Sequence, residues 1–261
     1  MFDWNLAISA LPVLIGMTFL TWLGSLVKRD VSIVDSVWSL FFLGALLTWW
    51  ALPPDNGPRA TTALILVTLW AVRLCFYLTR RNWGHPEDRR YQAIRARNQP
   101  NYEIKSLVIV FTLQAVLAWL IALPILPVLK STMPWGALDS LGVGVFAFGL
   151  AFEAIADAQM ARFKAGPKTA DAVLNTGLWR YTRHPNYFGE AVLWWGFYLL
   201  AVGAGAPLWI LLSPLLINVL LLKVSGVPLL EQDLAQRRPA YRDYIESTSS
   251  FIPRPPKVKA S

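Results

Sequence analysis

The sequence has few of the residues that cross-link proteins or bind metals. Its 261 residues include one cysteine, Cys75, and two histidines, His85 and His184. A single cysteine excludes a disulfide within the chain. So few histidine and cysteine side chains also argue against a zinc site. We therefore expect no metal.

The common motifs of soluble nucleotide-binding and hydrolytic enzymes are absent as well. The chain has no Gly-x-Gly-x-x-Gly after a strand, no P-loop, no Gly-x-Ser-x-Gly and no Cys-x-x-Cys. It also has no internal repeat, which argues against a transporter built from inverted repeats. Any nucleotide would have to be bound by the helices themselves.

The chain has few charged residues and several long apolar segments. Charged residues make up 15% of the chain and hydrophobic residues 55%, where soluble domains have about 25% charged residues. A transmembrane helix needs about 20 mostly apolar residues. The sequence predicts an all-α polytopic membrane protein with seven spans, at about 5–27, 31–52, 60–79, 106–129, 138–163, 188–205 and 207–223.

The basic residues predict the orientation of these spans. Of the 24 Lys and Arg residues, 21 lie at or near one side, only Arg59 and Lys130 lie on the other, and Arg73 lies within a span. The positive-inside rule then places the N-terminus outside and the C-terminus in the cytoplasm. The net charge of +8 is explained by this topology, so nucleic acid is not an expected partner.

Ionisable side chains within spans cost about 2.5–3.5 kcal/mol each and are candidates for function. Asp35 and Arg73 lie in neighbouring spans. They predict either a structural ion pair or the polar end of a substrate cavity.

Glu153 and Asp157, spaced i, i+4, share one helix face where their like charges repel. A solvated helix end would explain the following Lys164 but not Glu153, so this face predicts a ligand site.

The run from Gly177 to Glu190 gathers several more polar groups at the start of the sixth span. Pro185 fits the first turn of a helix, and Arg180, Arg183 and His184 crowd an N-terminus that already favours anions. Asn186 and Glu190 lie one turn apart and share a face. Together these residues predict a site for a ligand with an anionic end and a hydrogen-bonding end.

The tail continues this pattern. Lys223 ends the last span, and Glu231, Tyr241 and Tyr244 follow. A plain cytoplasmic helix carrying two tyrosines is the alternative to a role in ligand binding.

The run Leu178-Trp179-Arg180-Tyr181-Thr182-Arg183-His184-Pro185-Asn186-Tyr187-Phe188-Gly189-Glu190 resembles the signature of the steroid 5α-reductase superfamily. Asp35-Ser36-Val37-Trp38, Trp70-Ala71-Val72-Arg73-Leu74 and Glu87-Asp88-Arg89-Arg90-Tyr91 resemble its bacterial membrane branch. The Arg-His-Pro-x-Tyr core is shared with isoprenylcysteine carboxyl methyltransferases and sterol C14 reductases.

The resemblance implies a single seven-helix reductase domain over 1–261, with residues 1–130 mainly on the substrate side and 131–261 mainly on the cofactor side. It implies that NADPH enters from the cytoplasm and that the C=C bond of a conjugated ketone is reduced, such as the Δ4 bond of a 3-oxo-Δ4-steroid. The protein would then reside in a bacterial inner membrane, with a lipophilic enone and membrane lipid as its partners. No obligate protein partner is implied.

The cofactor contacts that the resemblance implies are Glu153, Asp157, Lys164, Trp179, Arg180, Arg183, His184, Asn186, Tyr187, Glu190, Lys223, Glu231 and Tyr241. In that family a carboxylate and a tyrosine from the N-terminal helices bind the substrate ketone. Asp35 matches the carboxylate, and Tyr77 is a candidate for the tyrosine, although Trp70 stands near where it would fall. Asp35, Tyr77 and Arg73 are thus the catalytic candidates.

Two other functions remain open from the sequence. A methyltransferase using S-adenosylmethionine would share the Arg-His-Pro-x-Tyr core, although such enzymes usually carry paired glutamates where this chain has Glu231-Gln232. A small-molecule transporter would also explain buried charges.

Overall fold

The computed structural model describes residues 2–52, 56–167, 169, 171–224, 226–227, 231 and 239–257. These residues form helices and connecting loops, with no strand among them. The chain divides into two compact units, Met1–Ser140 with Tyr198–Ser213 and Leu141–Phe197 with Pro214–Ser261. Each unit is described by itself.

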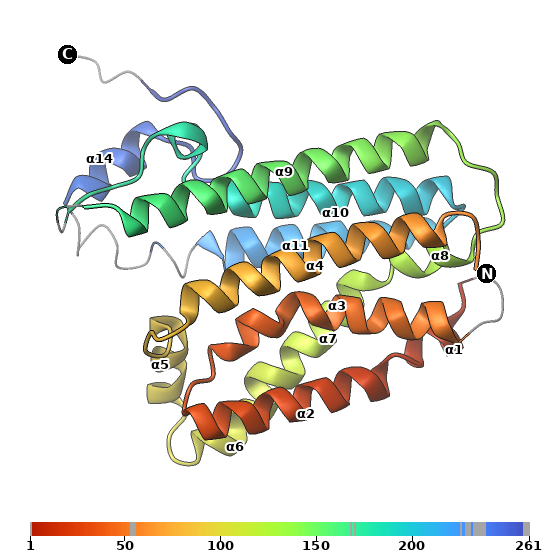
Figure 1. Cartoon of the computed structure of the whole chain (residues 1–261), viewed down its shortest axis with the longest axis horizontal. Coiled ribbons are helices and arrows are strands. Elements are labelled where there is room, and N and C mark those ends of the chain that lie inside the picture. The colour runs from red at the N-terminus through yellow and green to blue at the C-terminus, as the bar shows by residue number, and fades with distance from the viewer. Residues whose placement is uncertain are drawn as a thin grey trace. The chain divides into compact units, whose positions relative to one another are not determined.

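In the first unit α3 is the central helix (Figure 1). It packs against α2, α4, α7 and α8, so Asp35 in its first turn lies at the end of the helix with the most neighbours. The unit contains α1 (Trp4–Ile8), α2 (Leu11–Lys28), α3 (Ile33–Ala51), α4 (Ala60–Asn82), α5 (Arg89–Arg97), α6 (Tyr102–Ser106), η1 (Leu107–Thr112), α7 (Leu113–Ala122), α8 (Ile125–Lys130) and η3 (Leu208–Leu211).

Prolines interrupt two of the predicted spans. The first span is divided between α1 and α2, and Pro12 occupies the first turn of α2. The fourth ends earlier than predicted, because α7 stops at Ala122 and Pro124 caps the separate helix α8. Proline has no N–H to continue the helical hydrogen bonds.

The second unit is built mainly on α9 (Ala137–Ala165) and α10 (Pro185–Gly203), which run side by side in Figure 1. The first residues of α9 and the last of α10 belong to the first unit. The other described elements are η2 (Gly177–Arg180), α11 (Leu212–Val219), η4 (Leu220–Val224) and α14 (Ala240–Ser247).

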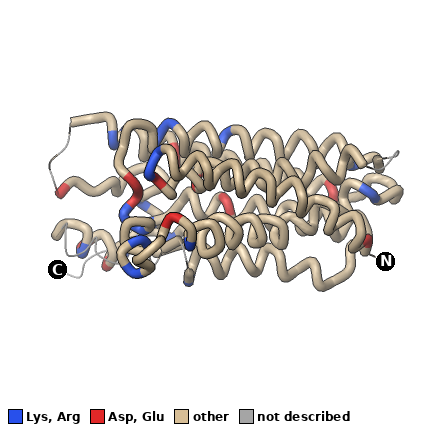
Figure 2. The backbone as a smooth tube through the Cα atoms, turned by 90° about the horizontal axis from the view of Figure 1, so that it is seen from below, with Lys and Arg blue, Asp and Glu red and all other residues tan. Residues whose placement is uncertain are grey.

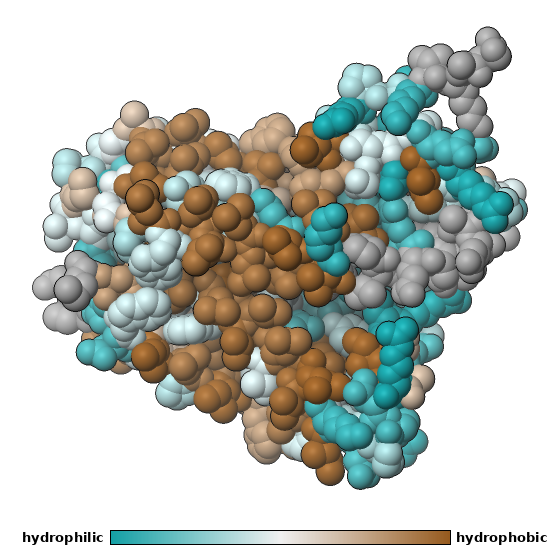
Figure 3. All heavy atoms as spheres, turned by 180° about the vertical axis from the view of Figure 1, so that it is seen from behind, coloured by the Kyte–Doolittle hydropathy of each residue, from teal (hydrophilic) through white to brown (hydrophobic). Residues whose placement is uncertain are grey.

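Five helical stretches in the described part of the chain are long and apolar enough to cross a membrane: Trp4–Lys28, Ile33–Ala51, Ala60–Asn82, Tyr102–Ala122 and Ala137–Ala165. They indicate a multi-pass integral membrane protein. Figure 3 shows hydrophobic side chains over the face seen there, and Figure 2 shows long stretches of helix without Lys, Arg, Asp or Glu. The predicted sixth span corresponds to α10, and the seventh to the shorter apolar stretch Leu208–Val224. Seven spans and the orientation stay predictions.

Arg59, which the sequence places in a polar turn, is fully buried in the first unit. Its Nε donates to Asp139 Oδ1 at 2.6 Å and its Nη2 donates to Asp139 Oδ2 at 2.7 Å. The remaining donors reach the backbone carbonyls of Met133, Pro134 and Gly203. A bidentate carboxylate and carbonyl acceptors satisfy a guanidinium that would otherwise be costly to bury. This one side chain therefore joins α4, the loop before α9 and the end of α10.

We predict that Arg59→Met lowers the free energy of unfolding by about 3–5 kcal/mol, because it leaves the Asp139 carboxylate buried without its partner. The double variant Arg59→Met/Asp139→Leu should recover part of that loss, since neither charge remains. Unfolding in detergent micelles measures both, with Arg97→Met at an exposed arginine as the control. Equal stability of Arg59→Met and Arg97→Met would show that the buried pair is unimportant.

Candidate functional site

Glycines bring α9 and α10 into close contact in the second unit. A Cβ added to Gly149 would meet the backbone of Leu193 and Gly189, and one added to Gly196 would meet the backbone of Phe146. Small residues let helix backbones approach in this way within membranes. A Cβ on Gly189 would lie 2.8 Å from Cβ of Glu153. The glycines thus place Glu153 directly against the residue that precedes Glu190.

Within the second unit, three carboxylate side chains are buried along this pair of helices. Glu153 is 2% exposed, Asp157 3% and Glu190 8%. The i, i+4 spacing predicted a shared face for the first two, and the structure buries both, while Asn186 is half-buried on α10. Buried carboxylates require hydrogen-bond donors or cations. Each carboxylate oxygen can accept more than one hydrogen bond, so this arrangement can also accept from a ligand that presents amide N–H or hydroxyl groups.

Arg183 is held by the C-terminal part of the chain. Its Nε donates to Glu231 Oε1 at 2.7 Å and its Nη2 donates to Glu231 Oε2 at 2.9 Å. Its Nη1 donates to the carbonyls of Thr248 and Ile245 at 2.5 and 3.2 Å. All three guanidinium nitrogens are therefore engaged within the protein. A contact of Arg183 with phosphates stays a prediction. A phosphate would have to accept from a guanidinium N–H that these partners leave unused.

Glu231 is the acceptor at the centre of this cluster. Besides Arg183, His184 Nε2 lies 2.8 Å from Glu231 Oε1, and the Tyr241 hydroxyl donates to the same oxygen at 3.3 Å. Burial alone would raise the pKa of Glu231, but the hydrogen bonds from His184 and Arg183 outweigh it and lower the pKa to about 2. Burial and the charge of Glu231 raise the pKa of Tyr241, so this phenol stays protonated.

Further hydrogen bonds hold the C-terminal segment against the motif before α10. The Arg183 N–H donates to Ser249 O and the Arg254 N–H donates to Tyr181 O, each at 2.9 Å. The Tyr244 hydroxyl donates to the carbonyl of Trp179. The tail tyrosines Tyr241 and Tyr244 are therefore buried anchors of α14, and their role in ligand binding stays a prediction. Gln232 lies outside the described residues.

The remaining predicted cofactor residues differ in exposure. Lys164, Arg180 and Lys223 are exposed. These three cations lie at the ends of α9, η2 and η4. Trp179 is buried, with its indole N–H on the carbonyl of Ala156 at 3.1 Å, and Tyr187 stacks on the His184 ring at 5.6 Å. The second unit thus offers buried acceptors and exposed cations, as a nucleotide with phosphate groups requires.

In the first unit, the hydrogen bonds of Asp35 are with Arg90 and Tyr91 rather than with Arg73, the partner that the sequence suggested. Arg90 Nη2 donates to Asp35 Oδ2 at 2.6 Å, and the Tyr91 hydroxyl donates to Asp35 Oδ1 at 2.6 Å. Gln114 Nε2 in turn donates to the Tyr91 oxygen at 3.0 Å. Burial and the charge of Asp35 raise the pKa of Tyr91, so its hydroxyl stays a donor.

Tyr91 is a candidate site residue that the sequence did not single out. Sequence reasoning considered Tyr77 as the partner of the carboxylate, but the ring of Tyr77 lies near the guanidinium of Arg81, with 6.0 Å between the guanidinium carbon and the ring centroid. The run Glu87-Asp88-Arg89-Arg90-Tyr91 contributed to the resemblance without any assigned role. Tyr91 lies on α5, 56 residues from Asp35 in sequence. Helical periodicity therefore could not predict the contact between them.

The fold and these clusters define a multi-pass, all-helical protein with a polar cluster in each unit. Residues 21–248 match the family model described as "Protein of unknown function (DUF1295)", so the chain belongs to the DUF1295 family. It is also 27% identical to an uncharacterized protein of Schizosaccharomyces pombe, over 89% of this chain and 75% of that protein. No solved structure matches the chain.

We predict that the docking of α14 weakens in acid. A folded-state pKa of about 2, below the ordinary value of 4.5, means that Glu231 stabilises the fold fully above pH 4.5 and loses this contribution as the pH falls from 4.5 toward 2. The melting temperature of the natural protein should therefore fall more between pH 6 and pH 3 than that of Glu231→Gln. The exposed Glu246→Gln should follow the natural protein. Parallel curves for all three proteins would contradict this assignment.

Proposed function

We propose that this protein is an NADPH-dependent membrane reductase that saturates the C=C bond of an α,β-unsaturated ketone in a lipophilic substrate, with 3-oxo-Δ4-steroids as the leading substrate class. The observation that carries the proposal is the Tyr91–Asp35 hydrogen bond of 2.6 Å, which pairs a neutral phenol with a carboxylate on the substrate side. The family resemblance supplies a role for such a pair. A methyl transfer has no need of a donor for a ketone oxygen.

The proposed chemistry assigns a task to each group of the first unit. Bound NADPH supplies the hydride that adds to the β-carbon of the enone. The Tyr91 hydroxyl donates to the ketone oxygen and stabilises the negative charge that develops there, and a proton is added at the α-carbon. The ketone competes with Asp35 for the Tyr91 proton. Arg90 keeps Asp35 paired meanwhile, so the carboxylate is not left unsatisfied.

The second unit supplies the groups that fit the cofactor. The buried carboxylates Glu153, Asp157 and Glu190 are acceptors for the carboxamide and ribose hydroxyls. Lys164, Arg180 and Lys223 are exposed cations suited to phosphates. S-adenosylmethionine has no phosphate to use them. We further propose seven spans in a bacterial inner membrane, with the N-terminus outside and this site facing the cytoplasm.

We predict that NADPH raises the melting temperature of the purified protein by mass action, whereas S-adenosylmethionine does not. Arg180→Ala should weaken NADPH binding about tenfold or more, as expected for a charged hydrogen bond of roughly 1.5–3 kcal/mol. Arg97→Ala, at another exposed arginine, should bind normally. Stabilisation by S-adenosylmethionine alone would contradict the reductase function and favour the methyltransferase function.

We predict that Tyr91→Phe lowers turnover of a 3-oxo-Δ4-steroid such as progesterone by about 10²-fold or more, because it removes the donor to the developing oxyanion. NADPH binding should be unchanged. The same substitution at Tyr77 distinguishes the two candidate tyrosines, and product analysis by chromatography measures both. Loss of turnover in Tyr77→Phe with normal turnover in Tyr91→Phe would assign the donor to Tyr77.

A further inference from the structure

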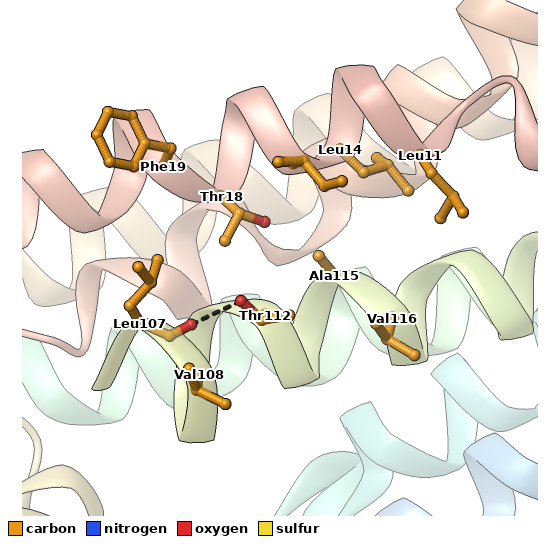
Figure 4. Close-up of a pocket in the computed structure, with 10 residues that line it drawn as sticks. Leu11, Leu14, Thr18, Phe19, Leu107, Val108, Thr112, Ala115 and Val116 are labelled. Atoms are coloured by element: carbon orange, nitrogen blue, oxygen red, sulfur yellow. Dashed lines mark hydrogen bonds between the residues drawn. The ribbon is translucent and has the colours of Figure 1, made fainter. Parts of the chain in front are cut away.

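A small groove lies in the first unit between α2 and the stretch η1–α7 (Figure 4). Its volume is about 220 Å³, and apolar side chains such as Leu14, Phe19, Val108 and Val116 form most of its walls. Two hydroxyl groups interrupt this apolar lining, those of Thr18 and Thr112. The groove lies on two of the stretches long enough to cross the membrane.

The hydroxyl of Thr18 lacks a hydrogen-bond partner among the described residues. The side chain is 4% exposed and its Oγ1 is buried. A threonine within a helix usually donates to the carbonyl four residues earlier. Thr21 donates in this way to Met17 O at 2.7 Å and Thr48 to Gly44 O at 2.8 Å. Thr18 departs from this pattern, and in Figure 4 its oxygen lies on the side of α2 that faces η1 and α7.

Thr112 also presents its oxygen at the groove. The residue ends the π-helical stretch η1, and its hydroxyl donates to Leu107 O at 2.8 Å. Its proton is therefore committed, but the oxygen keeps capacity to accept a hydrogen bond. The groove thus offers one free donor and one further acceptor in otherwise apolar surroundings.

Both hydroxyls lie close to the middle of their membrane spans. Thr18 is two residues from the centre of Trp4–Lys28, about 3 Å along the axis at roughly 1.5 Å per residue, and Thr112 is at the centre of Tyr102–Ala122. The bilayer at this depth contains hydrocarbon, so neither water nor a phospholipid headgroup is at hand to accept a hydrogen bond. A lipid tail would fill the groove but leave Thr18 unsatisfied.

We infer that the groove is a binding site for a neutral lipophile dissolved in the bilayer core, whose carbonyl oxygen accepts a hydrogen bond from Thr18. The volume of about 220 Å³ is below the range of about 300–1,000 Å³ that encloses drug-sized ligands. The groove therefore holds the oxygen-bearing part of the molecule and leaves the rest among the lipids. Asp35 and Tyr91 do not line it, so this site goes beyond the proposed reductase site and does not require NADPH.

Photolabelling tests the inference on the full-length protein in nanodiscs. The probe is a long-chain ketone carrying a diazirine. It should label peptides from α2 and from η1–α7, and the unlabelled ketone should compete while the alkane of equal length should not. Thr18→Val should lower labelling about two- to tenfold, the effect of one neutral hydrogen bond. Thr21→Val, whose hydroxyl is already bonded to Met17 O, is the matched control.

Thr18→Ser keeps the hydroxyl and should retain labelling, which separates loss of the donor from damage to the fold. Equal labelling of Thr18→Val and the natural protein would overturn the inference, as would equal competition by the alkane. Loss of groove labelling in Asp35→Asn would also overturn it, since the ketone would then belong to the substrate site. Failure of NADPH to bind would contradict the proposed reductase function but would leave the labelling of the groove unchanged.

Discussion

A charge buried in an apolar helix bundle has to be paired, because desolvation of an unpaired ion costs several kcal/mol. This constraint shapes the polar parts of both units. In the first unit, Arg59 and Asp139 join elements distant in sequence, and Asp35 is bound by Arg90 and Tyr91. In the second, Glu231 bonds Arg183 and His184. Each of these pairs joins segments that are distant in sequence.

The pairing also explains how polar chemistry is available in a largely hydrophobic chain. Arg90 donates to one carboxylate oxygen of Asp35, and the phenol of Tyr91 donates to the other. Glu231 satisfies Arg183 and thereby fixes the Arg-His-Pro-Asn-Tyr stretch at the start of α10. The carboxylates Glu153 and Glu190 lie on helices whose glycines permit close packing. The positions of these groups therefore follow from packing and pairing together.

Much of this organisation could be predicted from the sequence. Hydropathy predicted the long helices, and the i, i+4 spacing of Glu153 and Asp157 predicted a shared buried face. Both signals are local and depend on helical periodicity alone. All predicted cofactor residues fall within the second unit, and Asp35, Arg73 and Tyr77 fall within the first.

The partners of the charges could not be predicted, because they depend on contacts between distant segments. Asp35 and Arg90 are 55 residues apart, and Arg183 and Glu231 are 48 apart. The sequence placed Arg59 in a polar turn and did not predict the bond between Arg183 and Glu231, since a basic residue in a loop carries no local sign of a buried acceptor. The breaks at Pro12 and Pro124, by contrast, had a local signal that hydropathy alone does not register.

The central claim is that the protein transfers a hydride from NADPH to a lipophilic enone. Isotope transfer tests it most directly. Membranes containing the protein are incubated with progesterone and NADPH deuterated at C4 of the nicotinamide, and the product is analysed by mass spectrometry and NMR. The account predicts a saturated ketone with deuterium at the former β-carbon, formed by the natural protein and about 10²-fold or more slowly by Tyr91→Phe. Unchanged enone with no deuterium, together with transfer of a labelled methyl group from S-adenosylmethionine to a lipid acceptor, would contradict it.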